Sequence, residues 1–254
     1  MKVINSENFN TLPDAVLFDT DNTLYEYEPA HSKAISALKD KFKKTFSISD
    51  NQFERTYNAA REEIKEALNG SGASHSRLLY IQRMLEMLNL GSQVLMALDF
   101  EQTYWRTFLS NAELFDDVRE TLEDFRNLKI PVAIVTDLTA QIQFRKMVYF
   151  GLENHFDYIV TSEESGSDKP GPLSFSLAIN KMNAKRKKVW MIGDSYKNDI
   201  IGAKKTINAV AIQKIHKGVK VGSEKKFIDA YFKNFKELRV LLKKIAEENY
   251  EKAN

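Results

Sequence analysis

Acidic side chains lie in two short polar segments that are far apart in the sequence, and two more polar segments lie between them. The four segments are residues 19–23, 136–137, 169–170 and 193–199. The acids considered in the first and last segments are Asp19, Asp21, Asp194 and Asp199. Two carboxylates 4 Å apart repel each other by about 4 kcal/mol at an effective dielectric constant near 20, whereas a whole domain is stable by only about 5–15 kcal/mol. If the fold gathers these acids, a cation has to lie among them.

The available ligand types indicate which cation that is. The chain has no cysteine, and its four histidines show no metal-ligand spacing, so thiolate sites for zinc or iron–sulfur clusters are excluded. A hard divalent ion prefers oxygen, and Mg²⁺ suits a site that retains waters and shares phosphate oxygens. Lys169 adds a fixed positive charge, and the hydroxyls of Thr136 and Ser195 can donate hydrogen bonds to an anion. These residues predict a site for a dianion bridged by Mg²⁺.

Short apolar runs precede most of these segments and predict the elements that position them. The runs are residues 15–18, 132–135, 158–160, 189–192 and 209–212. Nearly continuous apolar runs are typical of buried strands in a parallel sheet, and helical patterns near 139–150, 172–183 and 197–205 separate the last four runs. This alternation predicts an α/β fold with a doubly wound parallel sheet. Since ligands of such sheets bind beyond the carboxyl ends of the strands, we expect the polar segments to meet there.

More than 100 residues separate the first two predicted strands, which is too long for a simple crossover. Apolar residues recur at helical spacing through most of this stretch. We therefore predict an α/β core of residues 1–27 and 111–254 with an all-helical domain inserted at 28–110. A helix over 113–128 should return the chain to the core, and the apolar stripe of 227–244 predicts a C-terminal helix that packs on it.

Composition excludes several classes of function. The formal net charge of +2 gives no argument for nucleic-acid or membrane binding, and neither a Walker-type loop nor a Rossmann glycine fingerprint is present. No run of 18 apolar residues occurs, and residues 1–15 lack the pattern of a secretory signal. We expect a soluble, cytoplasmic protein whose partner is a small molecule, with no nucleic acid and no membrane.

The ordered motifs resemble those of the haloacid dehalogenase-like hydrolase superfamily over nearly the whole chain. They read VLFDTDNTL, AIVTD, Lys169 within SDKPGPLSF, and WMIGDSYKND. The helical insertion looks like the cap of the family's first cap class. Phosphatase members carry an aspartate two positions after the nucleophile, as Asp21 stands here, whereas dehalogenases usually lack it. The resemblance therefore implies an Mg²⁺-dependent phosphatase that hydrolyses a small phosphomonoester through an aspartyl-phosphate intermediate.

The same resemblance assigns catalytic roles by position. Asp19 would be the nucleophile, and Asp21 would protonate the leaving oxygen and then deprotonate the attacking water. Thr136 would hold the transferring phosphoryl group, while Lys169 would screen the charges of the nucleophile and the phosphate. A turn aspartate, a helix-capping threonine or a solvated loop lysine is the structural alternative at these positions.

The resemblance also implies a metal-ligand set. Asp19 and Asp194 would bind Mg²⁺ with their carboxylates, and Asp21 with its backbone carbonyl. Asp199 would act indirectly, by contacting a residue that binds the ion or through a water molecule, although it could instead cap the next helix. Thr23 could contact the substrate, but a local hydrogen bond that shapes the loop is nearly as plausible.

Substrate recognition is expected from the helical insertion. His75 and Arg77 begin one of its predicted helices and are candidates to bind the substrate, although an ordinary exposed helix start explains these two residues as well. Ser195 in the core is a further substrate-binding candidate. A phosphomutase, a catalytically silent binding or scaffold protein and, last, a dehalogenase are the alternative functions. The motifs specify neither the phosphomonoester nor an oligomeric state.

Overall fold

A computed structural model describes residues 1–253 as two compact units. The α/β unit comprises Met1–Tyr25 and Leu114–Asn254, and the helical unit comprises Glu26–Glu113. Residue 254, the last of the predicted core range, lies outside the described residues. None of the helices within residues 1–253 is both long and apolar enough to cross a membrane.

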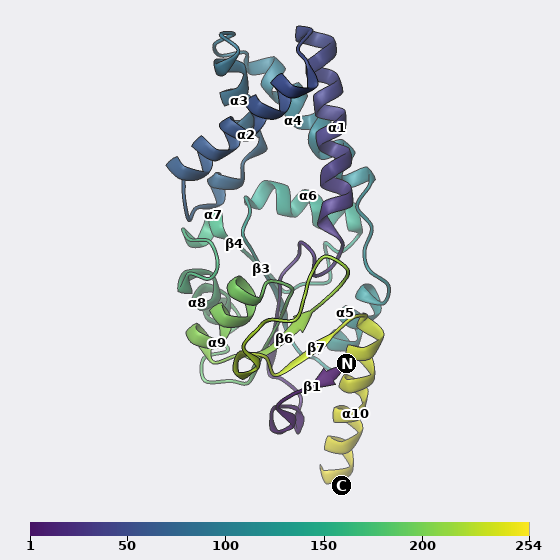
Figure 1. Cartoon of the computed structure of the whole chain (residues 1–254). Coiled ribbons are helices and arrows are strands. Elements are labelled where there is room, and N and C mark those ends of the chain that lie inside the picture. Colours follow the sequence, from purple (N-terminus) through teal and green to yellow (C-terminus); the bar gives the residue numbers. More distant parts are fainter. Residues whose placement is uncertain (254) are drawn as a thin grey trace. The chain divides into compact units, whose positions relative to one another are not determined.

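A mostly parallel sheet forms the centre of the α/β unit (Figure 1). In chain order its strands are β1 Lys2–Val3, β2 Ala15–Phe18, β3 Val132–Thr136, β4 Tyr158–Thr161, β5 Val189–Gly193, β6 Val210–Lys214 and β7 Ala230–Phe232. Across the described residues the sheet has seven strands in the order β1-β7-β6-β5-β2-β3-β4. Only the pairing of β1 with β7 is antiparallel. The predicted doubly wound parallel sheet is confirmed.

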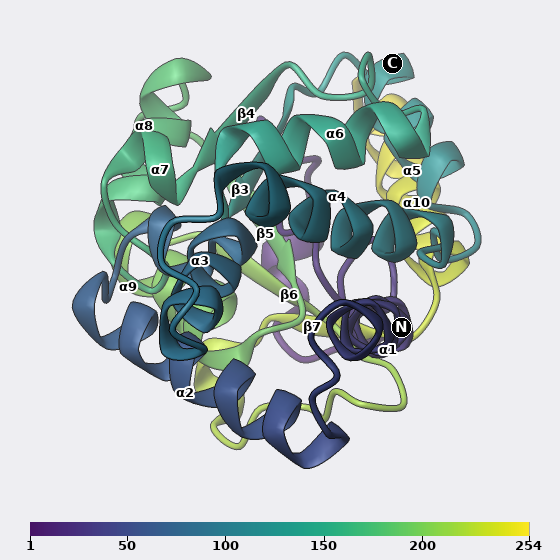
Figure 2. The same ribbon diagram turned by 90° about the horizontal axis from the view of Figure 1, so that it is seen from above.

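Helices cover both faces of this sheet. They are α5 Val118–Asn127, α6 Ala140–Phe150, α7 Ser162–Ser165, α8 Pro172–Lys181, α9 Gly202–Ile207 and α10 Phe235–Ala253, with short turns at η1 Ser6–Phe9, η3 Tyr196–Ile201 and η4 Lys225–Phe227. Figure 2 shows α8 and α9 on one side of the sheet and α5 and α10 on the other. Because successive strand residues face opposite sides, Leu17 and Met191 pack with Phe175 of α8, whereas Phe18 and Trp190 contact Phe125 of α5.

Strand register places the site-bearing loops at one edge. Phe18, the last residue of β2, pairs with Ile134 of β3 and with Ile192 of β5. Because these strands are parallel and in step, the residues that follow them emerge at the same carboxyl edge. The buried apolar side chains of β2 thus fix the position of Asp19, the residue that follows this strand.

Two sequence predictions were wrong in part. The helix predicted over 113–128 begins only at Val118, because Leu114 forms a bridge with Tyr25 and Asp117 has a left-handed backbone with φ of 64°. The helix predicted over 227–244 is interrupted by β7, and α10 begins at Phe235. Ala230 pairs with Ile212 of β6, so part of the apolar pattern belongs to a strand with alternating burial rather than to a helix.

The helical unit contains α1 Tyr27–Phe46, α2 Asp50–Ala67, η2 Gly72–His75, α3 Arg77–Met87 and α4 Val94–Ser110. Stacked rings hold it together: Phe42 of α1 lies 4.3 Å from Phe100 of α4 between ring centroids, and Phe53 of α2 packs edge-on against Phe42. The side chain of Ser76 accepts a hydrogen bond from the Leu79 amide at 3.3 Å and caps the start of α3.

Candidate active site

Lys169 connects acids from two distant segments at the carboxyl edge of the sheet. Its Nζ donates to Asp19 Oδ1 at 2.7 Å, to Asp199 Oδ1 at 2.7 Å and to the Val135 carbonyl at 2.9 Å. These bonds use all three donors of the ammonium group. Burial opposes the charge of Lys169, but the two carboxylates outweigh it and hold its pKa well above the usual value. The lysine is therefore a fixed positive charge, and the structure brings it to Asp19 as well as to Asp199.

Asp194 joins the same cluster. Carboxylate oxygens of Asp19, Asp194 and Asp199 all lie within 4.8 Å of one another. Burial raises the pKa of Asp19 to about 6 against the opposing effect of Lys169. Burial, followed by the charges of Asp19 and Asp199, raises the pKa of Asp194 to about 8. One lysine does not neutralise three neighbouring carboxylates, so this all-oxygen cluster suits a hard divalent cation.

Asp21 is oriented differently from the other three predicted ligands. Its Oδ1 accepts a hydrogen bond from Lys146 Nζ at 2.6 Å and another from the Tyr25 hydroxyl. Its carboxylate is not part of the three-acid cluster. Within the α/β unit, the side chain of Asp21 is thus held by a lysine, which leaves its backbone carbonyl as the group that the resemblance assigned to the metal.

Lys146 and its neighbour Gln143 were not predicted as site residues. Both lie on the buried face of α6, with Ile142 and Met147, and the side chain of Lys146 is 1% exposed. The amide nitrogen and oxygen of Gln143 are buried and have no hydrogen-bond partner among the described residues. Two polar side chains in an otherwise apolar helical stripe are unusual. This break in the apolar pattern is the feature of the sequence that could have identified Gln143 and Lys146 as site residues.

The hydroxyl groups near the acids make local hydrogen bonds. Thr23 Oγ1 donates to Asp19 Oδ2 at 3.0 Å, and Thr136 Oγ1 lies 3.1 Å from Thr20 Oγ1. Ser195 Oγ accepts from the Asn198 amide at 3.2 Å and caps η3, a π-helical turn. Thr23 therefore makes the local hydrogen bond that the sequence left open, Ser195 caps a turn, and Thr136 lies beside Thr20 at the strand end.

A glycine permits the close approach of Asp199 to the strand. A Cβ atom on Gly193 would lie 2.5 Å from Asp199 Cγ, which is a severe clash. Asp199 Oδ2 also accepts a hydrogen bond from the Ser195 amide at 2.9 Å. The tight turn after β5 therefore presents Asp199 to Lys169 only because residue 193 lacks a side chain.

The remaining candidates lie in the helical unit. Arg77 Nη2 donates to the Tyr27 hydroxyl at 2.6 Å, and Nη1 donates to the His75 carbonyl at 2.6 Å. The structure thus brings His75 and Arg77 together within that unit, as their neighbouring positions require.

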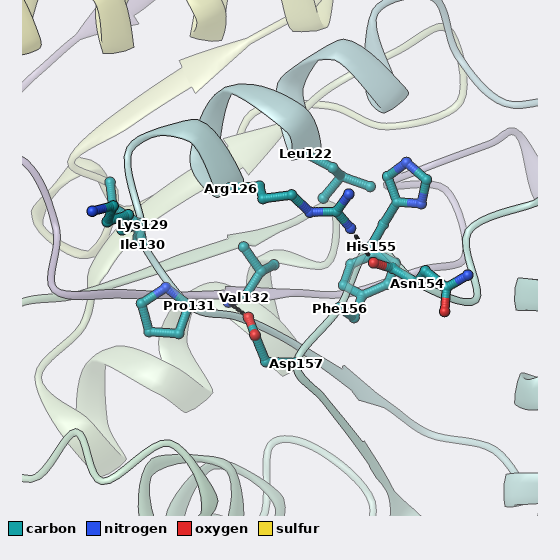
Figure 3. Close-up of a pocket in the computed structure, with 10 residues that line it drawn as sticks. All are labelled: Leu122, Arg126, Lys129, Ile130, Pro131, Val132, Asn154, His155, Phe156 and Asp157. Carbon is teal, nitrogen blue, oxygen red and sulfur yellow. Dashed lines mark hydrogen bonds between the residues drawn. The ribbon is translucent and has the colours of Figure 1, made fainter.

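A separate pocket of about 230 Å³ lies at the amino end of β3 (Figure 3). Val132 begins that strand and lines the pocket, whereas Thr136 ends it at the acid cluster. His155 also lines the pocket, and its Nδ1 is buried without a hydrogen-bond partner in the part of the chain that the structure describes. None of the predicted site residues lines this pocket, so it is distinct from the candidate active site.

Comparison with known proteins identifies relatives over most of the chain. The sequence model described as haloacid dehalogenase-like hydrolase matches residues 16–213. The chain is 35% identical over 202 residues to a ribulose-1,5-bisphosphate 5-phosphatase of Halopiger xanaduensis, covering 79% of this chain and 83% of that one. It is 29% identical to a glyceraldehyde 3-phosphate phosphatase of Methanopyrus kandleri, covering 74% and 78%. The crystal structure of a HAD phosphatase from Thermococcus onnurineus matches with a TM-score of 0.68 at 24% identity, covering 90% and 97%.

Proposed function

The chain belongs to the haloacid dehalogenase-like hydrolases and is a phosphoric monoester hydrolase, and we propose that it uses Asp19 as nucleophile and Mg²⁺ as cofactor on a small sugar phosphate. The observation that carries this proposal is the buried Lys169, whose Nζ lies 2.7 Å from both Asp19 and Asp199. A lysine in this position lowers the repulsion between a carboxylate nucleophile and an incoming phosphate dianion.

Asp19 performs the first step. Its carboxylate attacks phosphorus, an acyl-phosphate bond forms, and the bond from phosphorus to the ester oxygen breaks. Lys169 holds Oδ1 of this carboxylate and Thr23 holds Oδ2 at 3.0 Å, so the group is oriented before substrate arrives. Its pKa of about 6 leaves most of the carboxylate ionised at pH 7, as a nucleophile requires.

Asp21 carries the proton in both steps. It donates a proton to the leaving oxygen, and it then takes one from the water that attacks the phosphoenzyme and releases phosphate. Lys146, whose Nζ lies 2.6 Å from Asp21 Oδ1, would stabilise the carboxylate that remains after the proton has been given to the leaving oxygen. Lys146 and Tyr25 also fix where this carboxyl group lies.

The acid cluster fits a magnesium ion. Asp19 and Asp194 would bind it, with the Asp21 carbonyl, and Asp199 would support the site from beside Lys169. The ion would neutralise charge on the phosphate and on the carboxylates. The high pKa of Asp194, caused by burial and by its acidic neighbours, supports this assignment because the protein's own cations do not neutralise the cluster.

The relatives suggest the substrate class. Two of them are named for phosphorylated sugars: ribulose 1,5-bisphosphate, which has five carbons, and glyceraldehyde 3-phosphate, which has three. We therefore extend the proposal to sugar phosphates of this size, with residues of the helical unit, among them Arg77, contributing to substrate selection.

Phosphate release tests this function directly. Purified protein is assayed against ribulose 1,5-bisphosphate, glyceraldehyde 3-phosphate and 2-phosphoglycolate, with Mg²⁺ and with a chelator. We expect chelator-sensitive release from at least one compound, and loss of at least a thousandfold in Asp19→Asn, whose near-identical shape should preserve folding. Activity that survives either the chelator or this substitution would contradict the mechanism. With a substrate labelled in its phosphate group, transfer of the label to a second sugar hydroxyl instead of to water would identify a mutase.

A further inference from the structure

Gln213 is a buried polar side chain in a strand that begins with three apolar residues. It lies in β6, where it pairs with Gly193 of β5, and it is 1% exposed. A buried amide group lowers the stability of the folded state unless its donors and its acceptor find partners. The hydrogen-bond partners of Gln213 therefore indicate the role of this residue.

The amide group of Gln213 joins two separate segments of the α/β unit. Its Nε2 donates to the Asp194 carbonyl at 2.9 Å and to the Lys220 carbonyl at 3.1 Å. Its Oε1 accepts a hydrogen bond from the Gly222 amide at 3.0 Å. Both N–H groups and the carbonyl oxygen are thus engaged, and only this orientation of the amide suits two carbonyl acceptors and one N–H donor. Gln213 thereby connects the turn after β5 to the loop after β6.

The peptide group between Asp194 and Ser195 is held on both sides. Gln213 binds its carbonyl oxygen. On the other side, Asp199 Oδ2 accepts a hydrogen bond from the N–H of Ser195 at 2.9 Å. Because a peptide group is planar, these two bonds fix its orientation and constrain the backbone from which the Asp194 side chain projects.

The Asp194 carboxylate depends on this backbone for its position. Its oxygens and those of Asp19 and Asp199 lie within 4.8 Å of one another, so like charges push it away from the cluster. Lys169 holds the other two acids, whereas no donor among residues 1–253 is hydrogen-bonded to the Asp194 carboxylate. The hydrogen bonds of the 194–195 peptide therefore oppose this repulsion at Asp194.

The loop of residues 216–224 contacts the same turn at a second point. The hydroxyl of Tyr196 donates to the Glu224 carbonyl and accepts from the Glu224 amide, each at 3.1 Å. A Cβ atom on Gly222 would clash with the Tyr196 ring, so loop and turn are in close contact. Of these two attachments, that of Gln213 includes the Asp194 carbonyl.

We propose that Gln213 is a positioning residue of the metal site, which holds the Asp194–Ser195 peptide so that the Asp194 carboxylate faces Mg²⁺. This inference rests on the proposed function, since it takes Asp194 as a ligand of the ion. Loss of a group that orients a metal ligand typically weakens metal binding by about 10–100-fold. In this role Gln213 acts through Asp194 and touches neither the ion nor the substrate.

The affinity for Mg²⁺ of the wild type and two variants tests this role. Gln213→Met has a side chain of similar length but loses all three hydrogen bonds. Tyr196→Phe, the matched control, removes the two bonds to Glu224 and leaves the bond from Gln213 to Asp194 in place. In calorimetric titrations with magnesium chloride, the dissociation constant should rise about tenfold or more in Gln213→Met, and less than twofold in Tyr196→Phe. Thermal unfolding in chelator checks that both variants fold.

A residue with a purely structural role would change the melting temperature and leave the affinity for Mg²⁺ unchanged. A rise of less than tenfold in Gln213→Met, or a similar rise in Tyr196→Phe, therefore overturns the proposal. A KM for the phosphate ester that rises while the affinity for Mg²⁺ stays the same also overturns it, because Gln213 would then act on the substrate.

A second variant covers the case in which Gln213→Met does not fold. Gln213→Asn keeps an amide group that is one methylene shorter and cannot reach both segments, and the same tenfold criterion applies to it. If the wild type itself does not bind Mg²⁺, the metal assignment of the proposed function fails together with this inference. If the wild type binds the ion and the Gln213 variant binds it equally well, only this inference fails.

Discussion

Replacing Asp194 by asparagine should stabilise the metal-free protein and remove most of its response to Mg²⁺. Asp194 follows β5 and lies with Asp19 and Asp199 in a cluster whose carboxylate oxygens are within 4.8 Å of one another. No donor among the described residues is hydrogen-bonded to its carboxylate. Asparagine has nearly the same shape, so the substitution removes a charge and little else.

The magnitude follows from the pKa of Asp194, which burial and then the charges of Asp19 and Asp199 raise from 3.8 to about 8. The folded state therefore binds a proton that the unfolded state releases, and stability falls as pH rises from 3.8 towards 8. Each pH unit between 3.8 and 7 lowers the free energy of unfolding by about 1.36 kcal/mol, so that the loss at pH 7 is about 4 kcal/mol in all. Since Asp194 is partly exposed, solvent screening reduces this to about 2 kcal/mol. The gain for asparagine corresponds to about 4–8 °C in Tm for a chain of this length.

Thermal unfolding in chelator at pH 4, 7 and 8.5 measures this effect. The advantage of Asp194→Asn should be small at pH 4, clear at pH 7 and largest at pH 8.5. Mg²⁺ should then stabilise the wild type by about 2.7 kcal/mol at a hundred times its dissociation constant, and the variant far less. Asp40→Asn, at an exposed position of α1, is the control for a general charge effect. A variant less stable than wild type in chelator at pH 7, or equal stabilisation of both by Mg²⁺, would refute the argument.

Three further substitutions probe the surroundings of the acids. Lys146→Met should lower kcat at least tenfold with little change in KM, because Asp21 loses a donor at 2.6 Å; Lys146→Arg should retain more activity in steady-state kinetics, and equal losses would argue against a charge contact. Gln143→Leu should raise the free energy of unfolding by about 1–3 kcal/mol in urea denaturation, since it removes a buried amide with no partner; a decrease would mean that the amide has a partner outside the protein chain. Gly193→Ala should lower both kcat and stability, the latter by about 1–3 kcal/mol, because its Cβ would lie 2.5 Å from Asp199 Cγ; unchanged values in both assays would contradict that clash.

The interior of the sheet was predictable because parallel strands covered on both faces must be apolar throughout. The run 15–18 is β2 without change, and 189–192 lacks only Gly193 of β5. The edge strand β1 and its neighbour β7 were missed because two or three residues are too short to show a period of two. The helix over 113–128 was drawn too long because nothing in its periodicity reports a left-handed residue at 117.

The candidate site was predictable where its residues follow a strand directly. Asp19 and Asp194 come after β2 and β5, so the chain order alone brings them to one edge. Lys169 follows no strand, and only its motif indicated it. Lys146 was missed because its contact with Asp21 spans 125 residues and depends on how α6 packs after β3, which no local pattern contains.

Rigid strands are what allow such an acid cluster to form. Lys169 holds Asp19 and Asp199 together, but Asp194 has no comparable partner among the described residues and faces both acids. Repulsion of this kind would separate the three carboxylates if they stood on mobile loops. Here Asp19 follows Phe18, whose neighbour across the ladder is Ile192, and burial of these apolar residues fixes the spacing against that repulsion. The sheet thereby keeps three carboxyl groups close together where a cation can bind, and the stabilisation expected for Asp194→Asn measures the free energy that this proximity costs the metal-free protein.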